Sequence, residues 1–328
     1  MPSIKQIAEK AGVSISTVSF VLNGKGNEYR ISKETQDKIL QVAGELNYVP
    51  KERKTYKSSA SYAMRIVLLV ASRSSSMHYG TLFACLQNAL YDAQCPVQLS
   101  MQAYIPGKLS QCDTLMGELC DGMIIAGLNE IDYEYLHELQ TDIPIVLYNH
   151  KSDRFPYVAC DNYNSTISVV SMFAAHKKNN VCMVSPFADS TGFNSHLLGF
   201  SNGCAINNIE NATIFFCEYS KKGGEKIAGR IMQHEPDAIF VSSYQIALSI
   251  LQELTQRGVS VPQQVELVSI APFDVSVGGD DMITTLDIPA NEMISAALNM
   301  LIDIKYRDEN IQPKVFPMDI TYRQSCPK

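Results

Sequence analysis

Short apolar runs alternate with amphipathic stretches over most of the chain, and this alternation constrains the fold more than any other feature. The apolar runs are Ile66–Ala71, Val97–Met101, Gly122–Ala126, Pro144–Tyr148, Val181–Ser185, Thr213–Cys217, Ala238–Val241 and Val265–Ile270. The stretches with helical spacing lie at about 77–94, 107–119, 131–140, 162–176, 192–208, 223–234, 244–257 and 290–306. Strands that alternate with long helices form βαβ units, and continuous apolar strands fit parallel sheets covered on both faces. We therefore predict an α/β architecture, and its roughly 270 residues favour two lobes over one sheet.

The first fifty residues have a different pattern, with apolar positions at helical spacing and a glycine-containing turn. Ser3 precedes the first apolar positions and Gln6 follows three residues later, which is the spacing of a capping box. Gly12 stands where a helix ends, at a position that favours glycine. Ser14 caps a second predicted helix, and Ser32 starts a third. Two short helices joined by a tight turn, with a third across them, form the geometry that places one helix in a major groove of DNA.

The second predicted helix has an apolar inner face and a small, hydroxylic outer face. The inner face consists of Val18, Val21 and Leu22, and the outer face of Ser14, Ser16, Thr17 and Ser19. Small hydroxylic side chains let the backbone approach a duplex and can bond phosphate oxygens or base edges. The spacing alone leaves a second interpretation open, which is a generic three-helix bundle with a polar face.

Charge is divided along the chain as a DNA-binding headpiece requires. Residues 1–58 contain ten Lys and Arg against six Asp and Glu, a balance of +4, within a net charge of −7 for the chain. The other residues contain seventeen against twenty-eight, a balance of −11. The positive charge of residues 1–58 suits contact with DNA phosphates. The acidic part is typical of an ordinary surface that does not itself bind DNA.

Nothing in the sequence indicates a membrane segment or an export signal. No apolar run approaches the roughly 20 residues of a membrane span, and no charged and then apolar signal segment opens the chain. The nine cysteines are scattered, without a CxxC pair or histidines at zinc spacing, which is typical of buried thiols in a reducing compartment. We therefore expect a cytoplasmic protein with no membrane association, no metal and no cofactor.

Five motifs in the first fifty residues resemble the headpiece of the lactose-repressor (LacI/GalR) family of bacterial transcriptional regulators. They read Lys5-Gln-Ile-Ala-Glu-Lys-Ala-Gly-Val-Ser, Ser16-Thr-Val-Ser, Val21-Leu-Asn-Gly, Ile31-Ser-Lys-Glu-Thr and Glu45-Leu-Asn-Tyr-Val-Pro. The match runs through the whole headpiece with almost no gaps. The resemblance implies a sequence-specific DNA-binding regulator, a repressor, whose homodimer binds a pseudo-palindromic operator in double-stranded DNA.

The resemblance also implies which residues contact DNA. Ile15, Ser16 and Phe20 fall on the positions that read bases. The positions that touch phosphates or hold the headpiece together are Ser3, Ser14, Thr17, Ser19, Asn23, Arg30, Ser32, Thr35, Asn47 and Tyr48. Phe20 departs from the family, which often has Arg or His at this position. An apolar ring cannot bond a guanine edge but can contact a thymine methyl, so we expect a different operator base there.

Residues 50–61 are polar and begin with proline, which is typical of a linker. In the family this stretch becomes a hinge helix on DNA, and an apolar residue, commonly Leu, enters the minor groove. Here the usual Ala and Leu are missing, and Lys54, Tyr56 and Lys57 are the candidate DNA contacts. Two interpretations are open: Tyr56 replaces the wedge while the lysines bind phosphates, or the segment is a solvated tether.

The rest of the chain resembles the effector domain of the same family, which has a type I periplasmic-binding-protein fold. The motifs, in family order, are Cys120-Asp-Gly-Met-Ile-Ile, Ile143-Pro-Ile-Val, Asp161-Asn162, His176-Lys-Lys, Gly199-Phe200, Val261-Pro and Thr284-Thr285. The implied fold class is a multidomain α+β chain, with an all-α helix-turn-helix headpiece and a two-lobed α/β domain with parallel sheets. The implied domains are the headpiece 1–49, the hinge 50–61 and an effector-binding and dimerisation domain 62–328. Its N-terminal lobe comprises 62–160 and 290–313, and its C-terminal lobe 161–289 and 314–328.

We expect a small-molecule effector, a carbohydrate or a related metabolite, in the cleft between the lobes, at the carboxyl ends of the strands. The candidate effector-binding residues are Ser72, His78, Tyr79, Asn149, Asp161, His196, Tyr244, Phe273 and Asp274. Family positions that commonly hold a sugar-binding Arg, an Asn-Asp pair and an Asp appear here as His196, Ser243-Tyr244 and Ala271. Three explanations are open: a ligand unlike a typical sugar, a vestigial cleft with control by a protein partner, or a small register shift in the loops.

Several of these residues also have simpler interpretations. His196 can be a partly exposed helix residue, Asp161 a helix cap, and His176 a solvated residue in a Lys-rich loop. The sequence has no nucleophile elbow, phosphate loop or His-Glu metal motif, so we predict no catalytic residues and no enzyme. Two alternatives to a ligand-controlled repressor stay open: the same DNA-binding role under a protein co-repressor, and a cytosolic solute-binding module.

Overall fold

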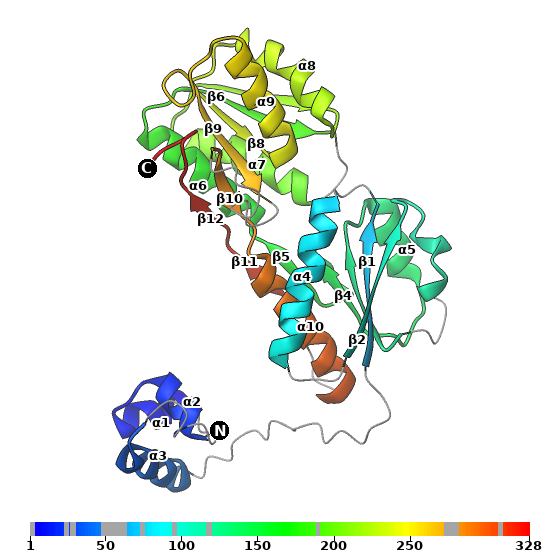
Figure 1. Cartoon of the computed structure of the whole chain (residues 1–328), viewed down its shortest axis with the longest axis vertical. Coiled ribbons are helices and arrows are strands. Elements are labelled where there is room, and N and C mark those ends of the chain that lie inside the picture. Colours follow the sequence, from blue (N-terminus) through cyan, green and yellow to red (C-terminus); the bar gives the residue numbers. More distant parts are fainter. Residues whose placement is uncertain are drawn as a thin grey trace. The chain divides into compact units, whose positions relative to one another are not determined.

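The computed structural model divides into two compact units, Met1–Ser58 and Ser59–Lys328, and each is described by itself (Figure 1). The residues that the structure describes are 4–22, 26, 31–46, 64–72, 76–93, 97–115, 120–187, 191–271, 282–307 and 311–328. In these ranges, none of the helices combines the length and the apolar character needed to cross a bilayer.

The first unit is a three-helix headpiece with α1 (Ile4–Ala11), α2 (Ile15–Leu22) and α3 (Lys33–Glu45). Each helix directs one apolar stripe inward, because its apolar residues recur at helical spacing. The buried set is Ile7, Ala8, Ala11, Val18, Val21, Ile39, Val42 and Ala43. All three predicted helices are confirmed, and the core that joins them is small.

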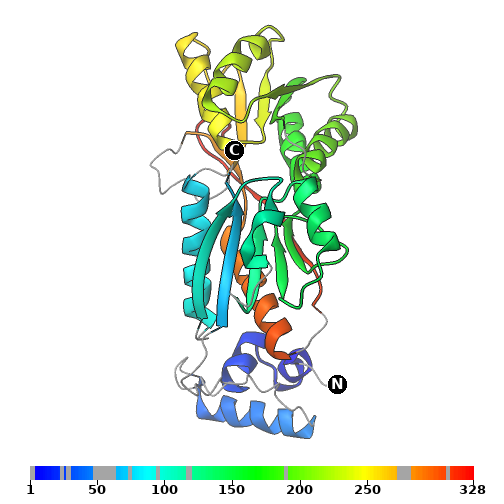
Figure 2. The ribbon, with the colours of Figure 1, turned by 90° about the vertical axis from the view of Figure 1, so that its right-hand side faces the viewer.

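The second unit contains two six-stranded sheets. The first sheet has the order β11-β5-β4-β3-β1-β2, and all of its neighbouring strands are parallel. Its strands are β1 (Met64–Ala71), β2 (Val97–Tyr104), β3 (Gly122–Ala126), β4 (Ile145–Tyr148), β5 (Tyr157–Cys160) and β11 (Lys314–Phe316). Figure 2 shows β1 and β2 side by side, with the cyan helix α4 (Ser76–Ala93) next to them.

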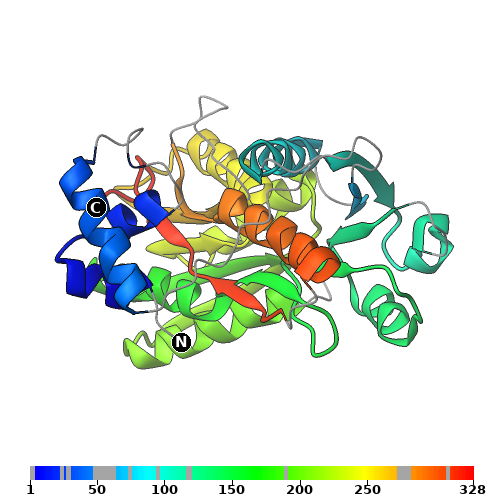
Figure 3. The same cartoon turned by 90° about the horizontal axis from the view of Figure 1, so that it is seen from below.

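Helices cover both faces of the first sheet. Alternate residues of β1, such as Val67 and Leu69, belong to an apolar cluster that includes α5 (Glu130–Glu138). The helix α10 (Ala290–Arg307), orange in Figure 3, packs against α4 and against β3, β4 and β5. Side chains of β1, β3 and β4 therefore face apolar neighbours on both sides, as the continuous apolar strands predict, whereas the edge strand β2 is largely exposed.

The second sheet has the order β12-β10-β9-β8-β6-β7, and only the pair β10–β12 is antiparallel. Its strands are β6 (Asn180–Pro186), β7 (Asn211–Cys217), β8 (Ala238–Val241), β9 (Glu266–Ala271), β10 (Thr284–Asp287) and β12 (Asp319–Thr321). Its helices are α6 (Asn162–Ala175), α7 (Thr191–Ile206), α8 (Lys221–Met232) and α9 (Tyr244–Gln256). Helices α8 and α9 share one apolar cluster with the strands, while α6 packs along α7.

The chain passes between the two sheets three times, at 160–162, 287–290 and 316–319. Two of these crossings are bonded to one another. The Asp161 amide donates to the Phe316 carbonyl at 2.7 Å, and the Met318 amide donates to the Ser165 Oγ at 3.1 Å. The last crossing lies later than we expected, because β11 pairs with β5 in the first sheet. The expected boundary at 313 places this strand in the wrong lobe.

All eight predicted apolar runs form strands, but one of the predicted helices is wrong. The stretch 107–119 contains two 3-10 turns, Leu109–Gln111 and Asp113–Leu115, in its described part. The reason is a contact from outside the stretch. The Asp132 carboxylate of α5 is buried, and it accepts hydrogen bonds from the Gly107 amide at 2.8 Å and the Leu109 amide at 3.0 Å. These bonds tie the start of the stretch to α5, where the chain forms short 3-10 turns.

Candidate DNA-recognition helix and ligand cleft

The turn between α1 and α2 is tight, and its geometry depends on glycine. Gly12 has a φ of 68°, in the left-handed region that glycine adopts without strain. The Val13 amide then donates to the Ala8 carbonyl at 3.1 Å and closes the end of α1. Ser14 caps α2, because its Oγ accepts a hydrogen bond from the Thr17 amide at 3.1 Å. The predicted helix-turn-helix is therefore confirmed.

The same cap occurs at the start of α2 and of α3. The Ser14 and Thr17 hydroxyl oxygens lie 2.8 Å apart, and so do those of Ser32 and Thr35. Ser32 also accepts a hydrogen bond from the Thr35 amide at 3.3 Å. Both serines are exposed. An exposed helix N-terminus presents amide hydrogens and the positive end of a dipole, which suits the phosphate contacts expected of these four residues.

The other expected DNA contacts lie outside what the structure describes. For Ile15, Ser16, Ser19 and Phe20, the helix backbone is described but the side chains are not. The residues outside the described ranges are Ser3, Asn23, Arg30, Asn47, Tyr48, Lys54, Tyr56 and Lys57. Their contacts with DNA stay predictions.

Three candidate effector-binding residues lie at the carboxyl edge of the first sheet. Ser72 follows β1, Asn149 follows β4 and Asp161 follows β5. The Asn149 Oδ1 accepts a hydrogen bond from the Cys160 amide at 3.1 Å, so its amide NH₂ is the group that it can still offer to a ligand. Asp161 caps α6 by accepting from the Asn164 amide at 3.2 Å. The simpler interpretation of Asp161 is thus confirmed, and it leaves this carboxylate at the sheet edge.

Two polar groups lie at the carboxyl edge of the second sheet: Ser243, which the sequence already places at a cleft position, and Asp287, which sequence reasoning missed. Ser243, between β8 and α9, and Asp287, the last residue of β10, each carry a buried oxygen with no hydrogen-bond partner in the described part of the chain. Such atoms usually mark a ligand or a bound water. Asp287 stands opposite Ala271 in the β9–β10 pair. A carboxylate is therefore present beside the position where the family's aspartate is missing, and only the strand register could have shown it.

Tyr244 and His196 differ in their access to this edge. Tyr244 is the first residue of α9, half-buried against the apolar cluster of the second lobe. His196 is 6% exposed, so the prediction of a partly exposed helix residue is wrong. It lies on α7, with its ring near Phe240 of β8 and its Nδ1 2.8 Å from the Thr166 Oγ1. Burial lowers the pKa of His196 to about 4, so the ring is neutral at neutral pH.

The hydrogen bonds also assign the tautomer of His196. The Thr166 hydroxyl donates to the Asn162 carbonyl at 2.8 Å, so its oxygen is left to accept from the His196 Nδ1–H. His196 differs from the expected partly exposed residue because its ring is buried between α6 and the second sheet. The side chains of His78 and Tyr79, and residues Phe273 and Asp274, lie outside what the structure describes.

His176 is half-buried and lies against a carboxylate, which corrects the expectation of a residue in a solvated loop. It ends α6, and its Nδ1 lies 3.0 Å from the Glu266 Oε2 at the start of β9. Glu266 also faces the Lys178 ammonium, 3.5 Å from its Oε1. The fold brings these groups together because the C-terminus of α6 lies at the amino end of the second sheet.

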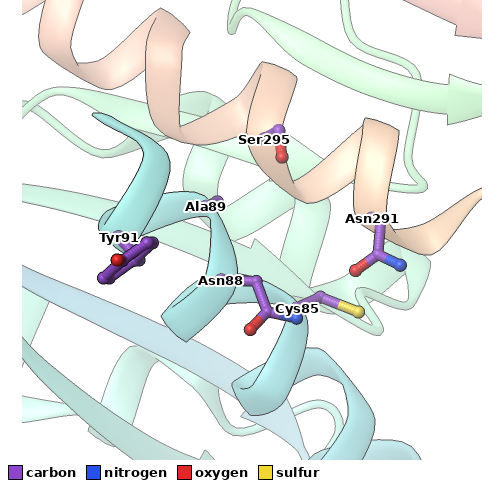
Figure 4. A pocket seen from close by; sticks show the side chains of 6 residues that line it. All are labelled: Cys85, Asn88, Ala89, Tyr91, Asn291 and Ser295. Atoms are coloured by element: carbon purple, nitrogen blue, oxygen red, sulfur yellow. The ribbon is translucent and has the colours of Figure 1, made fainter. Parts of the chain in front are cut away.

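A separate hollow lies on the outside of the first lobe, between α4 and α10 (Figure 4). Its lining residues are Cys85, Asn88, Ala89, Tyr91, Asn291 and Ser295. Tyr91 is 87% exposed, the most exposed large apolar or aromatic side chain in the described part of the chain. A large aromatic ring in this position is more typical of a protein interface than of a free surface.

Two family models match the chain. The model described as bacterial regulatory proteins, lacI family, matches residues 3–51. The model described as periplasmic binding protein-like domain matches residues 170–326. The first match covers the helix-turn-helix headpiece, and the second covers most of the second lobe.

Similar proteins cover most of the chain. Catabolite control protein A of Streptococcus mutans is 22% identical over 312 residues, which are 94% of this chain and 92% of the relative. The sucrose operon repressor of Klebsiella pneumoniae is 24% identical over 264 residues, 78% of each chain. These relatives are regulators, and both are distant in sequence.

Solved structures share the fold. A LacI family transcription regulator from Clostridium acetobutylicum superposes with a TM-score of 0.74 at 25% identity, over 79% of this chain and 99% of that one. The lac repressor dimer bound to operator and the anti-inducer ONPF superposes with a TM-score of 0.69 at 19% identity, over 100% and 99%. The second likeness supports the fold alone.

Proposed function

We propose that this chain, which belongs to the lacI family of bacterial regulatory proteins, represses transcription as a homodimer that binds a pseudo-palindromic operator. The observation that carries the proposal is the helix-turn-helix of α1 and α2, closed by Gly12 and capped by Ser14, within the segment that matches the lacI model. A regulator that binds an operator acts where the DNA is, so we propose that it works in the cytoplasm.

Affinity for DNA is controlled by a small polar ligand at the carboxyl edges of the two sheets. Ser72, Asn149 and Asp161 offer polar groups from the first sheet, and Ser243 and Asp287 offer them from the second. Neutral hydroxyls and carboxylates of this kind suit a carbohydrate or a related polyhydroxy metabolite. The name of the Klebsiella pneumoniae relative, a sucrose operon repressor, supports the same ligand class.

The ligand acts through the three crossings between the sheets. A ligand that contacts both edges binds more tightly to one arrangement of the lobes than to another, and only this difference in affinity can change DNA binding. The Asp161–Phe316 and Met318–Ser165 hydrogen bonds join two of the crossings, so the crossings move together.

The homodimer forms through the first lobe, with Tyr91 and the hollow between α4 and α10 in the interface. An exposed aromatic beside a hollow is the kind of feature that a second copy buries. A twofold dimer carries two headpieces, and two headpieces require a twofold operator.

A protein co-repressor is the second candidate for the controlling partner. The name of the Streptococcus mutans relative, catabolite control protein A, favours it. Thermal shift of the full chain with a panel of sugars tests the small ligand, and a pull-down with phosphocarrier protein tests the co-repressor. A sugar that raises Tm and changes operator affinity decides for the ligand. Complex formation without any sugar effect decides for the co-repressor.

Selection from a library of randomised palindromic DNA with the full chain tests DNA recognition. We expect a discrete palindrome to emerge and to bind in a salt-dependent way, at least about 1,000-fold more tightly than bulk DNA. Tyr91→Asp is expected to yield a monomer in sedimentation and to weaken operator binding, while Tyr219→Asp, at an exposed tyrosine of the second lobe, serves as the matched control. A chain that binds all DNA sequences alike contradicts the proposed function.

A further inference from the structure

We propose that the second lobe contains a zinc site formed by His176, Glu266 and Cys326. The three side chains come from the end of α6, the start of β9 and the C-terminal segment. One ligand atom of each lies within 4.8 Å of the other two. The cluster is at the amino end of the second sheet, whereas the effector cleft is at its carboxyl end. The zinc site is therefore separate from the proposed ligand site.

The distances fit a tetrahedral ion. With bonds of about 2.0–2.3 Å, tetrahedral zinc holds nitrogen, oxygen and sulfur ligands about 3.3–3.6 Å apart. Here the His176 Nδ1 is 3.0 Å and the Cys326 Sγ 3.2 Å from the Glu266 Oε2, and the Sγ and Nδ1 are 4.0 Å apart. Each separation differs from the tetrahedral range by about 0.4 Å or less, which small side-chain rotations supply.

The C-terminal segment is fixed where it presents the thiol. The Ser325 hydroxyl donates to the Leu267 carbonyl at 2.5 Å, and the Leu267 amide donates to the Ser325 carbonyl at 3.0 Å. The Thr284 hydroxyl donates to the Cys326 carbonyl at 2.7 Å. These bonds join the segment to β9 and β10, so the thiol is preorganised beside Glu266 and does not have to be ordered by the metal.

The donor set selects the class of metal. One imidazole, one carboxylate and one thiolate suit zinc, whereas magnesium and calcium prefer oxygen ligands alone. Burial, together with the Glu266 carboxylate, raises the pKa of the Cys326 thiol. Zinc binds a cysteine as the thiolate, so binding at Cys326 releases the thiol proton to solvent. A water completes the coordination, with entry past His176, whose side chain is 25% exposed.

Lys178 is the competing partner of the carboxylate. Its ammonium lies 3.5 Å from the Glu266 Oε1, while the Oε2 is the oxygen that faces His176 and Cys326. An ammonium beside Oε1 leaves Oε2 available to the zinc ion, but its positive charge repels that ion. Without zinc, the same groups form an ionic network around a buried carboxylate. A measurement of zinc binding therefore distinguishes the zinc site from this ionic network.

Titration of the tag-free full chain with zinc chloride, in competition with a chromogenic chelator, tests the site. We expect one equivalent to bind and to raise Tm. Cys326→Ser and His176→Gln should each weaken binding at least about tenfold, and magnesium should not compete. Cys204→Ser is the matched control, because Cys204 is another buried thiol, on α7.

The outcomes separate the zinc site from incidental thiol binding. Failure to bind zinc at micromolar concentration, or equal loss in Cys204→Ser and Cys326→Ser, overturns the proposal. If Cys326→Ser does not fold, His176→Gln at the half-buried ring decides alone. Lys178→Gln should tighten zinc binding several-fold, whereas Lys177→Gln at the exposed neighbour should not. Equal affinity in the two lysine variants places the ion elsewhere and also overturns the proposal.

Discussion

The headpiece and the two-sheet unit are held together over very different distances along the chain. All eight buried residues of the headpiece core fall within residues 7–43. In the larger unit, the Cys160 and Met293 sulfurs meet at 3.4 Å across 133 positions, and the Met318–Ser165 hydrogen bond spans 153. Local caps and periodicity therefore specify the headpiece, whereas crossings between lobes specify the larger unit. A site in the headpiece is therefore contiguous in sequence, whereas a site in the larger unit combines residues that are far apart along the chain.

A charged residue in the headpiece core should have the largest effect. It should destabilise the headpiece and leave the stability of the larger unit unchanged. Val18 is fully buried in a core of eight small to medium side chains. Val18→Asp buries an unpaired carboxylate, which costs on the order of 3–5 kcal/mol, more than so small a core can absorb. We expect operator affinity to fall more than about 100-fold, measured by fluorescence anisotropy.

The thermal transition of the larger unit should not change in the same variant. Leu40→Asp is the control, because Leu40 lies on α3 with 52% of its surface exposed and its substitution should cost little. A shared loss of stability in both units would show that they fold as one, which contradicts the comparison.

The larger unit should show a pH dependence from a buried histidine, whereas residues 1–58 contain no histidine. The pKa of His196 is lowered to about 4 in the folded chain by burial, and an unfolded histidine titrates near 6.5. Between these values the unfolded chain binds more protons, so stability is present above about pH 6.5 and is lost as the pH falls toward 4. The full loss is on the order of 3 kcal/mol.

Urea unfolding of the larger unit between pH 5 and 7 measures this slope. His196→Gln should flatten it, although not entirely, because burial also lowers the pKa of His150. His234→Gln, at an exposed ring against Phe215, is the matched control for the loss of an imidazole. Stability that does not change with pH in the parent chain would contradict the burial of a neutral His196.

How far the sequence predicts the structure follows the same division. The headpiece could be predicted almost completely, because Gly12, Ser14 and Ser32 act on residues within four positions of themselves. Strands of the larger unit could be predicted where they are apolar throughout, even where they are short, as β4 and β8 are. Strand β10 could not, because it begins with Thr284-Thr285 and ends with Asp287, and β5 was missed although it is as short as β4 and β8.

The sites of the larger unit were less accessible to sequence reasoning. Asp287 carries no local signal, because its place at the edge depends on the register of β10 against β9. His196 has the helical spacing of either a surface or a buried residue, and the Thr166 bond across α6 and α7 decides for burial. Cys326 and His176 are 150 positions apart, so no zinc spacing could reveal them.

The next largest effect is on base recognition in the operator, which depends on the headpiece alone. Phe20→Arg should change the preferred base at one operator position, because Arg can bond guanine where Phe meets a thymine methyl, a difference of about 1–3 kcal/mol. Ser16→Ala should also change preference. Lys54→Ala should weaken binding to all sequences alike, because a phosphate contact carries no base information. Library selection with each variant measures this, and equal effects from all three contradict the assigned roles.

The smallest effect is the change in headpiece stability when either of two glycines is replaced by alanine. The two substitutions distinguish backbone geometry from packing. A methyl group added at either Gly12 or Gly44 would meet no atom within 4 Å, so neither substitution causes a clash. Gly12 has a φ of 68°, whereas Gly44 lies inside α3. Gly12→Ala should therefore destabilise the headpiece by about 1 kcal/mol, and Gly44→Ala should stabilise it by about 1 kcal/mol.

Chemical denaturation of the full chain, followed by amide signals of the headpiece, measures both changes. Because the two substitutions add the same methyl group to open space, opposite signs can come only from the backbone conformation. Operator affinity should follow the headpiece stability in each variant, while the transition of the larger unit stays fixed. If both variants lose stability equally, the left-handed turn at Gly12 does not determine how α2 is placed, and local geometry is not what specifies the headpiece.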